Sequence, residues 1–134
     1  MSKSDFKRLY KKAKSIQKYN EYSPFITAGG ISCALMTSKG NIFTGVNVDT
    51  RCSLGTCAER NAIMNMLTNG ENEVTKLVCL YRDGRLMTPC GACSEFFLQL
   101  AEKNKELEIL VDLDSFKTIK LKETFHKWWG KDRY

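Results

Sequence analysis

Residues 74–81 read Val-Thr-Lys-Leu-Val-Cys-Leu-Tyr, a short and almost uninterrupted run of apolar side chains. A run of this length is typical of a β-strand that is buried on both faces. Such a strand needs a layer of helices on each side to cover it. We therefore expect residues 74–81 to lie in the centre of a sheet that has helices on both faces.

The segments around this strand supply the rest of the sheet and the helices. A hairpin is expected before it, because two strand-like runs flank the turn Ser38-Lys39-Gly40-Asn41. In chain order we expect a first helix that includes residues 6–16, a loop at 20–24, strands at 29–37 and 42–48, a helix at 57–67, the strand at 74–81, a helix at 91–103, strands at 107–111 and 118–121, and a terminal helix at 122–129. This order predicts an α/β fold of three layers, α/β/α, with a mixed five-stranded sheet.

The size and composition of the chain indicate one domain, residues 1–134. The chain has 134 residues, of which 43% are hydrophobic and 27% are charged, which is enough for one core and too little for two. Its apolar stretches are strand-sized, which argues against a membrane span. The N-terminus runs into a charged, helix-like pattern without an apolar signal core, so we expect a cytoplasmic protein. The six cysteines then need an explanation other than extracellular disulfides.

The net charge of +6 comes largely from the first helical segment. The apolar side chains of this segment fall on one helical face and its cations fall on the other. The cations are Lys3, Lys7, Arg8, Lys11, Lys12, Lys14 and Lys18. We interpret them as a solvated face, with a polyanion-binding helix as the alternative.

Two short motifs carry the strongest chemical signal: Thr56-Cys57-Ala58-Glu59-Arg60 and Pro89-Cys90-Gly91-Ala92-Cys93. Each stands at the expected start of a helix. Cys90 and Cys93 have the spacing with which two thiolates converge on one zinc ion, and Cys57 supplies a third ligand from a second helix. Three protein ligands leave one tetrahedral position open for water, which is the arrangement of a catalytic rather than a structural zinc.

Glu59 and Arg60 lie two and three residues after Cys57, so both can act on the same site. Glu59 is too close in sequence to become a fourth ligand easily, but it is well placed to take a proton from water and return it to a ring nitrogen and a leaving amine. Three thiolates on one Zn²⁺ leave a formal negative charge that opposes ionisation of the water. Helix N-termini offset part of this charge, and Arg60 could donate to a thiolate and offset more. The alternative for Arg60 is a solvated helix arginine.

The remaining cysteines, histidine and tryptophans receive structural interpretations. Cys33, Cys52 and Cys79 lie in or near expected strands without partners at ligand spacing, so we expect them to be core residues. His126 is the single histidine, and a histidine-based nucleophilic mechanism would depend on it without a supporting motif. Trp128 and Trp129 are interpreted as a packing cap rather than a ligand-stacking platform.

The motifs Cys-Ala-Glu-Arg and Pro-Cys-Gly-Ala-Cys, in this order and at this separation, resemble those of the homotetrameric cytidine deaminases and the related blasticidin S deaminases. The resemblance covers roughly residues 29–100, including Phe43-Thr44-Gly45-Val46-Asn47-Val48-Asp49 in the expected hairpin. It implies a cytidine deaminase-like fold, a homotetramer, and zinc bound by the three cysteines of the motifs. By the same resemblance Glu59 is the proton shuttle and Arg60 tunes the thiolates. Asn47 and Asp49 contact the sugar, and the Ala58 backbone faces the pyrimidine edge.

The sequence departs from the family pattern at positions that touch the substrate or a neighbouring subunit. Gly29 or Gly30 stands where cytidine deaminases usually have a phenylalanine, and Ser94-Glu95 replaces the common Arg-Gln. Asp49 replaces a glutamate. The segment from Asn47 to Cys57 is about one residue short and lacks a tyrosine. None of these changes affects the metal-binding motifs, so reaction class is better supported than substrate identity.

Three functions compete. The first is an aminohydrolase that releases ammonia from cytidine, deoxycytidine or an analogue such as blasticidin S. The second is a deaminase of tRNA or single-stranded DNA, which the basic N-terminal helix favours. Its relatives commonly use histidine as the first ligand, however, and we find no run of aromatic and basic residues, so nucleic acid is not the expected partner. The third is a non-catalytic structural zinc module, which a fourth protein ligand would favour.

Overall fold

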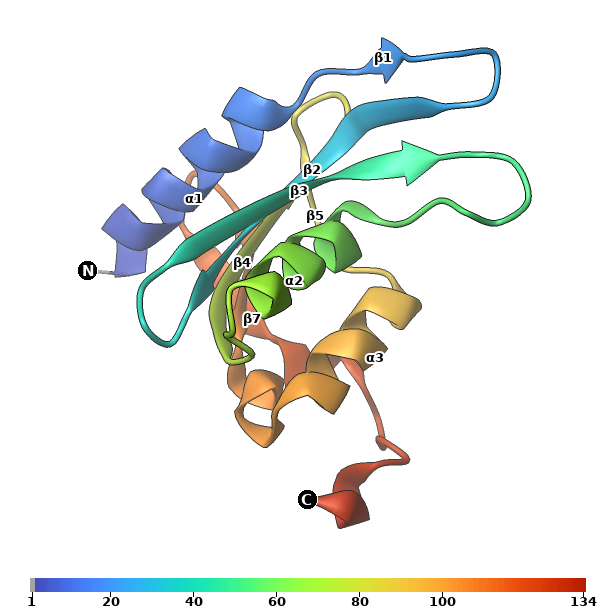
Figure 1. The fold of residues 1–134 in the computed structure, drawn as a ribbon. Helices are drawn as coiled ribbons and strands as arrows, with labels where there is room; N and C mark the ends of the chain where they lie inside the picture. The colour runs from blue at the N-terminus through green and yellow to red at the C-terminus, as the bar shows by residue number, and fades with distance from the viewer. Residues whose placement is uncertain (1) are drawn as a thin grey trace.

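The computed structural model describes residues 2–134 and, for Ser2, the backbone. Its strands form a central sheet, and its helices lie against that sheet (Figure 1). In chain order they are α1 (Ser2–Ile16), β1 (Asn20–Glu21), β2 (Thr27–Thr37), β3 (Ile42–Asp49), α2 (Ala58–Thr68), β4 (Val74–Leu80), β5 (Leu86–Met87), α3 (Gly91–Leu100), the 3-10 helix η1 (Glu102–Glu106), β6 (Glu108–Asp112), β7 (Lys117–Lys120), and the 3-10 helices η2 (Leu121–Thr124) and η3 (Lys131–Arg133).

The strands form a mixed sheet in the order β1-β2-β4-β6-β7, with β3 paired to β2 and β5 paired to β4. β4 and β6 run parallel, whereas the other pairs are antiparallel. The five predicted strands correspond to β2, β3, β4, β6 and β7, so the predicted α/β class is confirmed. The predicted number of strands is too low, because the two-residue strands β1 and β5 raise it to seven. β1 lies inside segment 20–24, which we expected to be a loop throughout.

Helices cover the sheet on both faces (Figure 1). On one face α1 packs Phe6, Leu9 and Ala13 against side chains of β2, β4 and β6, and these residues form one buried cluster. On the other face α2 and α3 pack against the alternate side chains of the same strands in a second cluster. Because neighbouring residues of a strand point to opposite faces, β4 contributes to both clusters. The predicted burial of this strand on both faces is confirmed.

A close approach between β3 and α2 determines where the second helix lies. A Cβ atom on Gly45 would stand 2.4 Å from the Ala62 nitrogen and 2.6 Å from the Ala58 carbonyl oxygen. The side-chain amides of Asn61 and Asn65 donate to the carbonyl oxygens of Val46 and Thr44, at 3.1 and 2.7 Å. These bonds satisfy carbonyl groups on the edge of β3 that faces away from β2. β3 therefore holds α2 at a short and defined distance.

The C-terminal part of the chain differs from the prediction. α3 ends at Leu100 rather than at residue 103, because Ala101 is extended (φ −165°, ψ 143°). The terminal helix predicted over residues 122–129 is wrong: η2 ends at Thr124, and residues 125–130 contain no regular helix. Long-range contacts replace the helical ones here, since Glu95 Oε1 accepts hydrogen bonds from the indole nitrogens of Trp128 and Trp129 at 3.0 and 3.1 Å.

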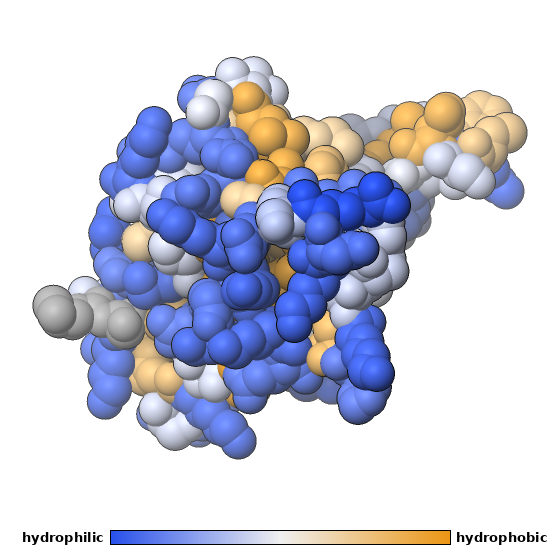
Figure 2. All heavy atoms as spheres, turned by 90° about the horizontal axis from the view of Figure 1, so that it is seen from below, coloured by the Kyte–Doolittle hydropathy of each residue, from blue (hydrophilic) through white to orange (hydrophobic). Residues whose placement is uncertain are grey.

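The surface is largely polar, with apolar side chains on projecting segments. In Figure 2 hydrophilic side chains cover most of the visible face, and hydrophobic ones gather on the arm that projects to the right. The most exposed large apolar or aromatic side chains are Tyr22, Phe25, Leu54 and Trp129. None of the helices found in residues 2–134 combines the length and the apolar character that a transmembrane helix requires.

Candidate active site

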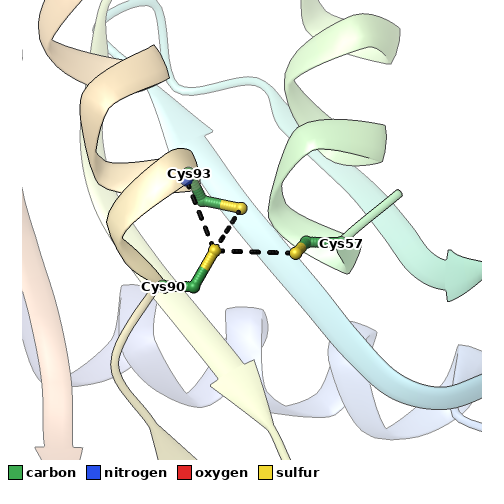
Figure 3. Close-up of side chains that lie close together, drawn as sticks. All are labelled: Cys57, Cys90 and Cys93. Carbon is green, nitrogen blue, oxygen red and sulfur yellow. Dashed lines mark hydrogen bonds between the residues drawn. The ribbon is translucent and has the colours of Figure 1, made fainter. Parts of the chain in front are cut away.

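The N-termini of two helices lie next to each other, and a cysteine occupies the N-cap position of each helix. Cys57 is the N-cap of α2 and Cys90 is the N-cap of α3, both with extended backbone. Cys93 lies in the first turn of α3, and its backbone N–H donates to the Cys90 sulfur at 3.5 Å. The three side chains point toward one another from the two helix ends (Figure 3).

The three sulfur atoms have the spacing of a metal-binding cluster. Cys90 Sγ lies 3.6 Å from Cys57 Sγ and 3.3 Å from Cys93 Sγ, and all three lie within 4.8 Å of one another. Zinc bonded to sulfur at roughly 2.3 Å in tetrahedral geometry keeps its ligands roughly 3.8 Å apart. These residues therefore fit a zinc ion without a large movement. Within residues 2–134 the group consists of the three cysteines and no fourth protein ligand.

The surroundings favour negative charge on this cluster. Both helix N-termini direct partial positive charge at the sulfurs. Burial opposes ionisation of Cys90, but hydrogen bonds with Cys93 and Cys57 outweigh it and hold the pKa of Cys90 below its ordinary value. Burial raises the pKa of Cys93, so a cation is needed to keep all three sulfurs deprotonated.

Arg60 reaches back to the cluster from the first turn of α2. Its Nη2 lies 3.7 Å from Cys57 Sγ, and this hydrogen bond raises the pKa of the guanidinium. Its Nε is buried and has no hydrogen-bond partner among the described residues. The side chain is therefore not the freely solvated helix arginine that we considered as the alternative.

Glu59 is a buried carboxyl group beside the sulfurs. It is 1% exposed, and its Oε1 finds no hydrogen-bond partner in residues 2–134. Burial raises the pKa of this carboxyl, although hydrogen bonds with the Glu59 and Cys90 backbones and with the Cys93 thiol oppose the shift. An unpartnered buried oxygen is costly and is usually explained by a functional group or a bound partner. Glu59 is thus poised to hold a proton and to exchange it with a ligand.

A cavity of about 530 Å³ opens beside the cluster. Cys57, Cys90, Glu59 and Arg60 line it together with all three of the positions that we expected to contact substrate, Asn47, Asp49 and Ala58. The sequence therefore indicated residues from three separate segments that the fold brings to one hollow.

Asn47 is held in one orientation at the wall of this cavity. Its Oδ1 accepts from the Ile31 backbone N–H at 2.8 Å, so its Nδ2 is the donor that faces Asp49 Oδ2 at 3.2 Å. The amide thus presents an oriented donor next to an exposed carboxylate. Hydroxyl groups of a sugar, which both donate and accept, are suited to such a pair.

Ile31 and Met87 also line the cavity, although we did not expect them there from the sequence. Ile31 lies within β2 and Met87 ends β5, and neither position has a distinctive sequence pattern, so only the fold reveals them. The opposite wall is the loop between β3 and α2, which backbone bonds between Val48 and Thr56 close at 2.9 and 3.0 Å. Gly55 is required there, since a Cβ would lie 2.4 Å from the Val48 oxygen.

The other cysteines and the histidine lie outside this cavity. Cys33 and Cys79 are fully buried opposite one another on β2 and β4, as expected of core residues. The expectation for Cys52 is wrong, because it is exposed in the loop before α2 with a positive φ of 58°. His126 lines a different hollow beside Leu98 and Trp128.

Known proteins share this fold and part of the sequence. Residues 3–106 match the model of the cytidine and deoxycytidylate deaminase zinc-binding region. A probable cytidine deaminase of Dictyostelium discoideum is 35% identical over 107 residues, which cover 76% of this chain and 69% of the relative. The cytidine deaminase of Mycoplasma pneumoniae is 31% identical over 105 residues, covering 76% and 77% of the two chains. The crystal structure of cytidine deaminase from Mycobacterium tuberculosis has 25% identity and a TM-score of 0.75, with 94% and 98% of the chains covered. This chain therefore belongs to the cytidine and deoxycytidylate deaminase family.

Proposed function

We propose that this protein is a zinc-dependent hydrolytic deaminase of free cytosine nucleosides that converts them to the uracil form with release of ammonia. The observation that carries the proposal is the buried, unpartnered carboxyl oxygen of Glu59 beside three convergent cysteines at one end of a cavity. The substrate class is supported by relatives named as cytidine deaminases.

In this proposal Cys57, Cys90 and Cys93 hold the zinc ion. A zinc ion with one open position lowers the pKa of a bound water to near neutrality and so supplies a nucleophile. Three cysteines without a fourth protein ligand in residues 2–134 support a catalytic centre over the structural zinc module. The hydrogen bond from Arg60 to Cys57 withdraws charge from one sulfur and leaves the site less negative.

Glu59 carries the protons in this mechanism. A carboxyl group with a raised pKa takes up a proton at neutral pH more readily than an exposed one. We assign Glu59 to accept one proton of water and to deliver it to the ring nitrogen next to the reacting carbon. Glu59 then takes the second proton, from the hydroxyl group now on that carbon, and passes it to the amino group, which leaves as ammonia when its bond to the carbon breaks. Its burial keeps bulk water from competing for these transfers.

The sugar and the base are assigned to the two sides of the cavity. Asn47 and Asp49 would bind sugar hydroxyls through the oriented amide donor and the carboxylate. The backbone of Ala58, which begins α2 next to Cys57, would face the edge of the base. Cytidine, deoxycytidine and a larger analogue such as blasticidin S are all candidates, because about 530 Å³ exceeds what a nucleoside requires.

We further propose a cytoplasmic homotetramer. All six cysteines are unpaired, and a site of three thiolates needs a reducing compartment. Exposed Phe25, Leu54 and Trp129 offer apolar contacts to other subunits. Analytical ultracentrifugation tests the assembly: a monomer at micromolar concentration would contradict it.

The function is tested by ammonia release from cytidine, deoxycytidine, cytosine and blasticidin S, with the purified zinc-loaded protein. We expect turnover of at least one of them, and we expect Glu59→Gln to reduce kcat by about 10²–10⁴-fold with zinc still bound. Glu102→Gln, which changes an exposed carboxylate on η1, is the matched control and should be neutral. A zinc-loaded protein that releases no ammonia from any of the four compounds would contradict the proposal.

A further inference from the structure

A row of lysines runs along one flank of α1. Lys7, Lys11 and Lys14 follow one another at intervals of four and three residues, so they share one side of the helix, and Lys18 follows two residues after α1 ends. All four are exposed, and no ion pair involves any of them in the part of the chain that the structure describes. Neighbours at such spacing lie roughly 6 Å apart, which is close to the separation of successive phosphates in an extended nucleic-acid strand.

Two turns from distant parts of the sequence meet this flank. The turn between β4 and β5 lies against the C-terminal end of α1. There the Lys14 Nζ would be 2.9 Å from a Cβ atom added to Gly84. Gln17 holds the turn in place by donating to the carbonyl oxygens of Tyr81 and, at 3.0 Å, of Gly30. The turn between β6 and β7 lies beside Lys7 and Lys11.

Each turn brings aromatic rings and cations into contact. The guanidinium of Arg82 stacks on the ring of Tyr19 at 3.7 Å from the centroid, and that of Arg85 lies 4.9 Å from the centroid of Tyr81. Both rings are partly exposed, at 38% and 39%. Bases of single strands stack on such rings and on arginine planes.

An apolar hollow of about 390 Å³ lies at the other end of the row. Tyr10, Leu113 and Phe116 line it, and Lys7 and Lys11 stand at its edge. The Lys7 Nζ is 5.8 Å from the centre of the Phe116 ring. A hollow with an apolar lining and flanking cations fits an unstacked base whose phosphates lie on the lysines.

Few acidic groups oppose this charge. Asp83 forms an ion pair with Arg85 at 2.7 Å. Asp5 contacts Arg8 and Lys76 on the other side of the helix. Asp112 accepts from Ser115 within the turn between β6 and β7. Asp114, which follows Leu113 in that turn, and Glu21, which lies three residues after Lys18, are exposed carboxylates near the row.

We propose that this basic flank, defined as Lys7, Lys11, Lys14, Lys18 and Arg82 with the rings of Tyr19, Tyr81 and Phe116, binds single-stranded nucleic acid. An anionic membrane fits less well, because the apolar face of α1 is buried against the sheet and leaves nothing to insert into lipid. The flank lies on the opposite face of the sheet from α2 and α3, so binding there does not depend on the proposed deamination. These rings and cations come from three separate segments, so they do not form a continuous aromatic and basic run in the sequence.

Fluorescence anisotropy with a labelled single-stranded RNA of about twelve nucleotides tests the proposal on the full zinc-loaded chain. If the five cations each contact a phosphate, affinity should fall about a hundredfold between about 50 and 200 mM salt. The triple variant Lys11→Ala/Lys14→Ala/Lys18→Ala should leave a decrease of only about sevenfold over the same range, because two contacts remain. Cytidine deamination should not change in this variant.

Three further measurements separate the proposal from general attraction to anions. The matched control Lys103→Ala/Lys127→Ala/Lys131→Ala removes equal charge from η1 and the C-terminal segment and should keep the wild-type affinity and salt slope. Tyr19→Ala should weaken binding about tenfold without changing the slope. A duplex of equal length should bind less tightly than the single strand.

The proposal would be overturned by any of four results. These are equal weakening by the control triple, a duplex that binds as tightly as the single strand, binding to phosphatidylserine vesicles but not to RNA, or no binding of the RNA at about 50 mM salt. Circular dichroism of each variant confirms that it is folded; alanine is compatible with the exposed lysine positions of α1.

Discussion

Replacing Gly45 by alanine should displace the helix that carries half of the site. The added Cβ would stand 2.4 Å from the Ala62 nitrogen and 2.6 Å from the Ala58 oxygen. Both are backbone atoms of α2, so no side chain can rotate away. An ordinary contact needs about 3.5 Å, and β3 and α2 must therefore separate by about 1 Å.

This separation has two expected consequences. Overpacking of this kind costs about 1–3 kcal/mol in the free energy of unfolding. Because Cys57 and Glu59 stand at the start of α2, they would also move relative to Asn47 on β3. A displacement of about 1 Å at a reacting group can reduce turnover about a hundredfold.

Urea denaturation and ammonia release from cytidine measure the two consequences separately. Gly40→Ala is the control: it lies in the hairpin turn with φ +83° and nothing within 4 Å of its Cβ. Its left-handed conformation should cost about 1–2 kcal/mol, with kcat unchanged. If Gly45→Ala retained wild-type kcat, or lost activity no more than Gly40→Ala at equal stability, the coupling of β3 to the site would be refuted.

Three other changes test separate parts of the molecule. In the metal-free protein, burial raises the pKa of Glu59, so the folded state holds its proton more tightly and stability falls as pH rises from the ordinary carboxyl range through the raised pKa. Glu59→Gln should remove this fall and increase stability at neutral pH by about 1–3 kcal/mol, which urea titrations from acid to neutral pH would detect. Treatment with 1,10-phenanthroline should abolish ammonia release and lower the midpoint of thermal unfolding, and both should return with added zinc but not with magnesium. Glu95→Ala should leave two indole N–H groups without their acceptor, cost about 1 kcal/mol per bond and shift tryptophan fluorescence to the red, whereas an unshifted spectrum would argue against the contacts with Trp128 and Trp129.

The central layers and the cluster could be predicted because their causes are local. Strand-sized apolar runs, the turn at residues 38–41 and the helical spacing after Cys57 each depend on nearby residues. The spacing of Cys90 and Cys93 places both sulfurs at the end of one helix for the same reason. The resemblance to cytidine deaminases added Asn47 and Asp49 as expected sugar contacts. The side chain of Asn47 faces Asp49 because its oxygen accepts a hydrogen bond from the Ile31 backbone.

The end of α3 and the segment after β7 could not be predicted, because long-range contacts decide their conformation. Asn104 is fully buried and makes hydrogen bonds of 2.8 to 3.0 Å with Val74, Asn72 and Phe97, which fixes the chain beyond α3. Residues 122–129 have a helix-like pattern but do not form the predicted helix, because the indoles of Trp128 and Trp129 donate hydrogen bonds to Glu95. Neither the contacts of Asn104 nor those of the indoles can be predicted from a short-range sequence pattern.

Strand β3 positions both the helix that carries the metal site and the residues proposed to contact the sugar. Its middle, at Gly45, sets the distance of α2 and therefore of Cys57 and Glu59. Its end carries Asn47 and Asp49, which line the same cavity. The spacing between the proposed metal site and the proposed sugar contacts is thus set by one rigid strand rather than by loops. A change of substrate could therefore arise at Asp49 or in the loop before Cys57 while the metal site stays intact, which is the pattern of departures that the sequence shows.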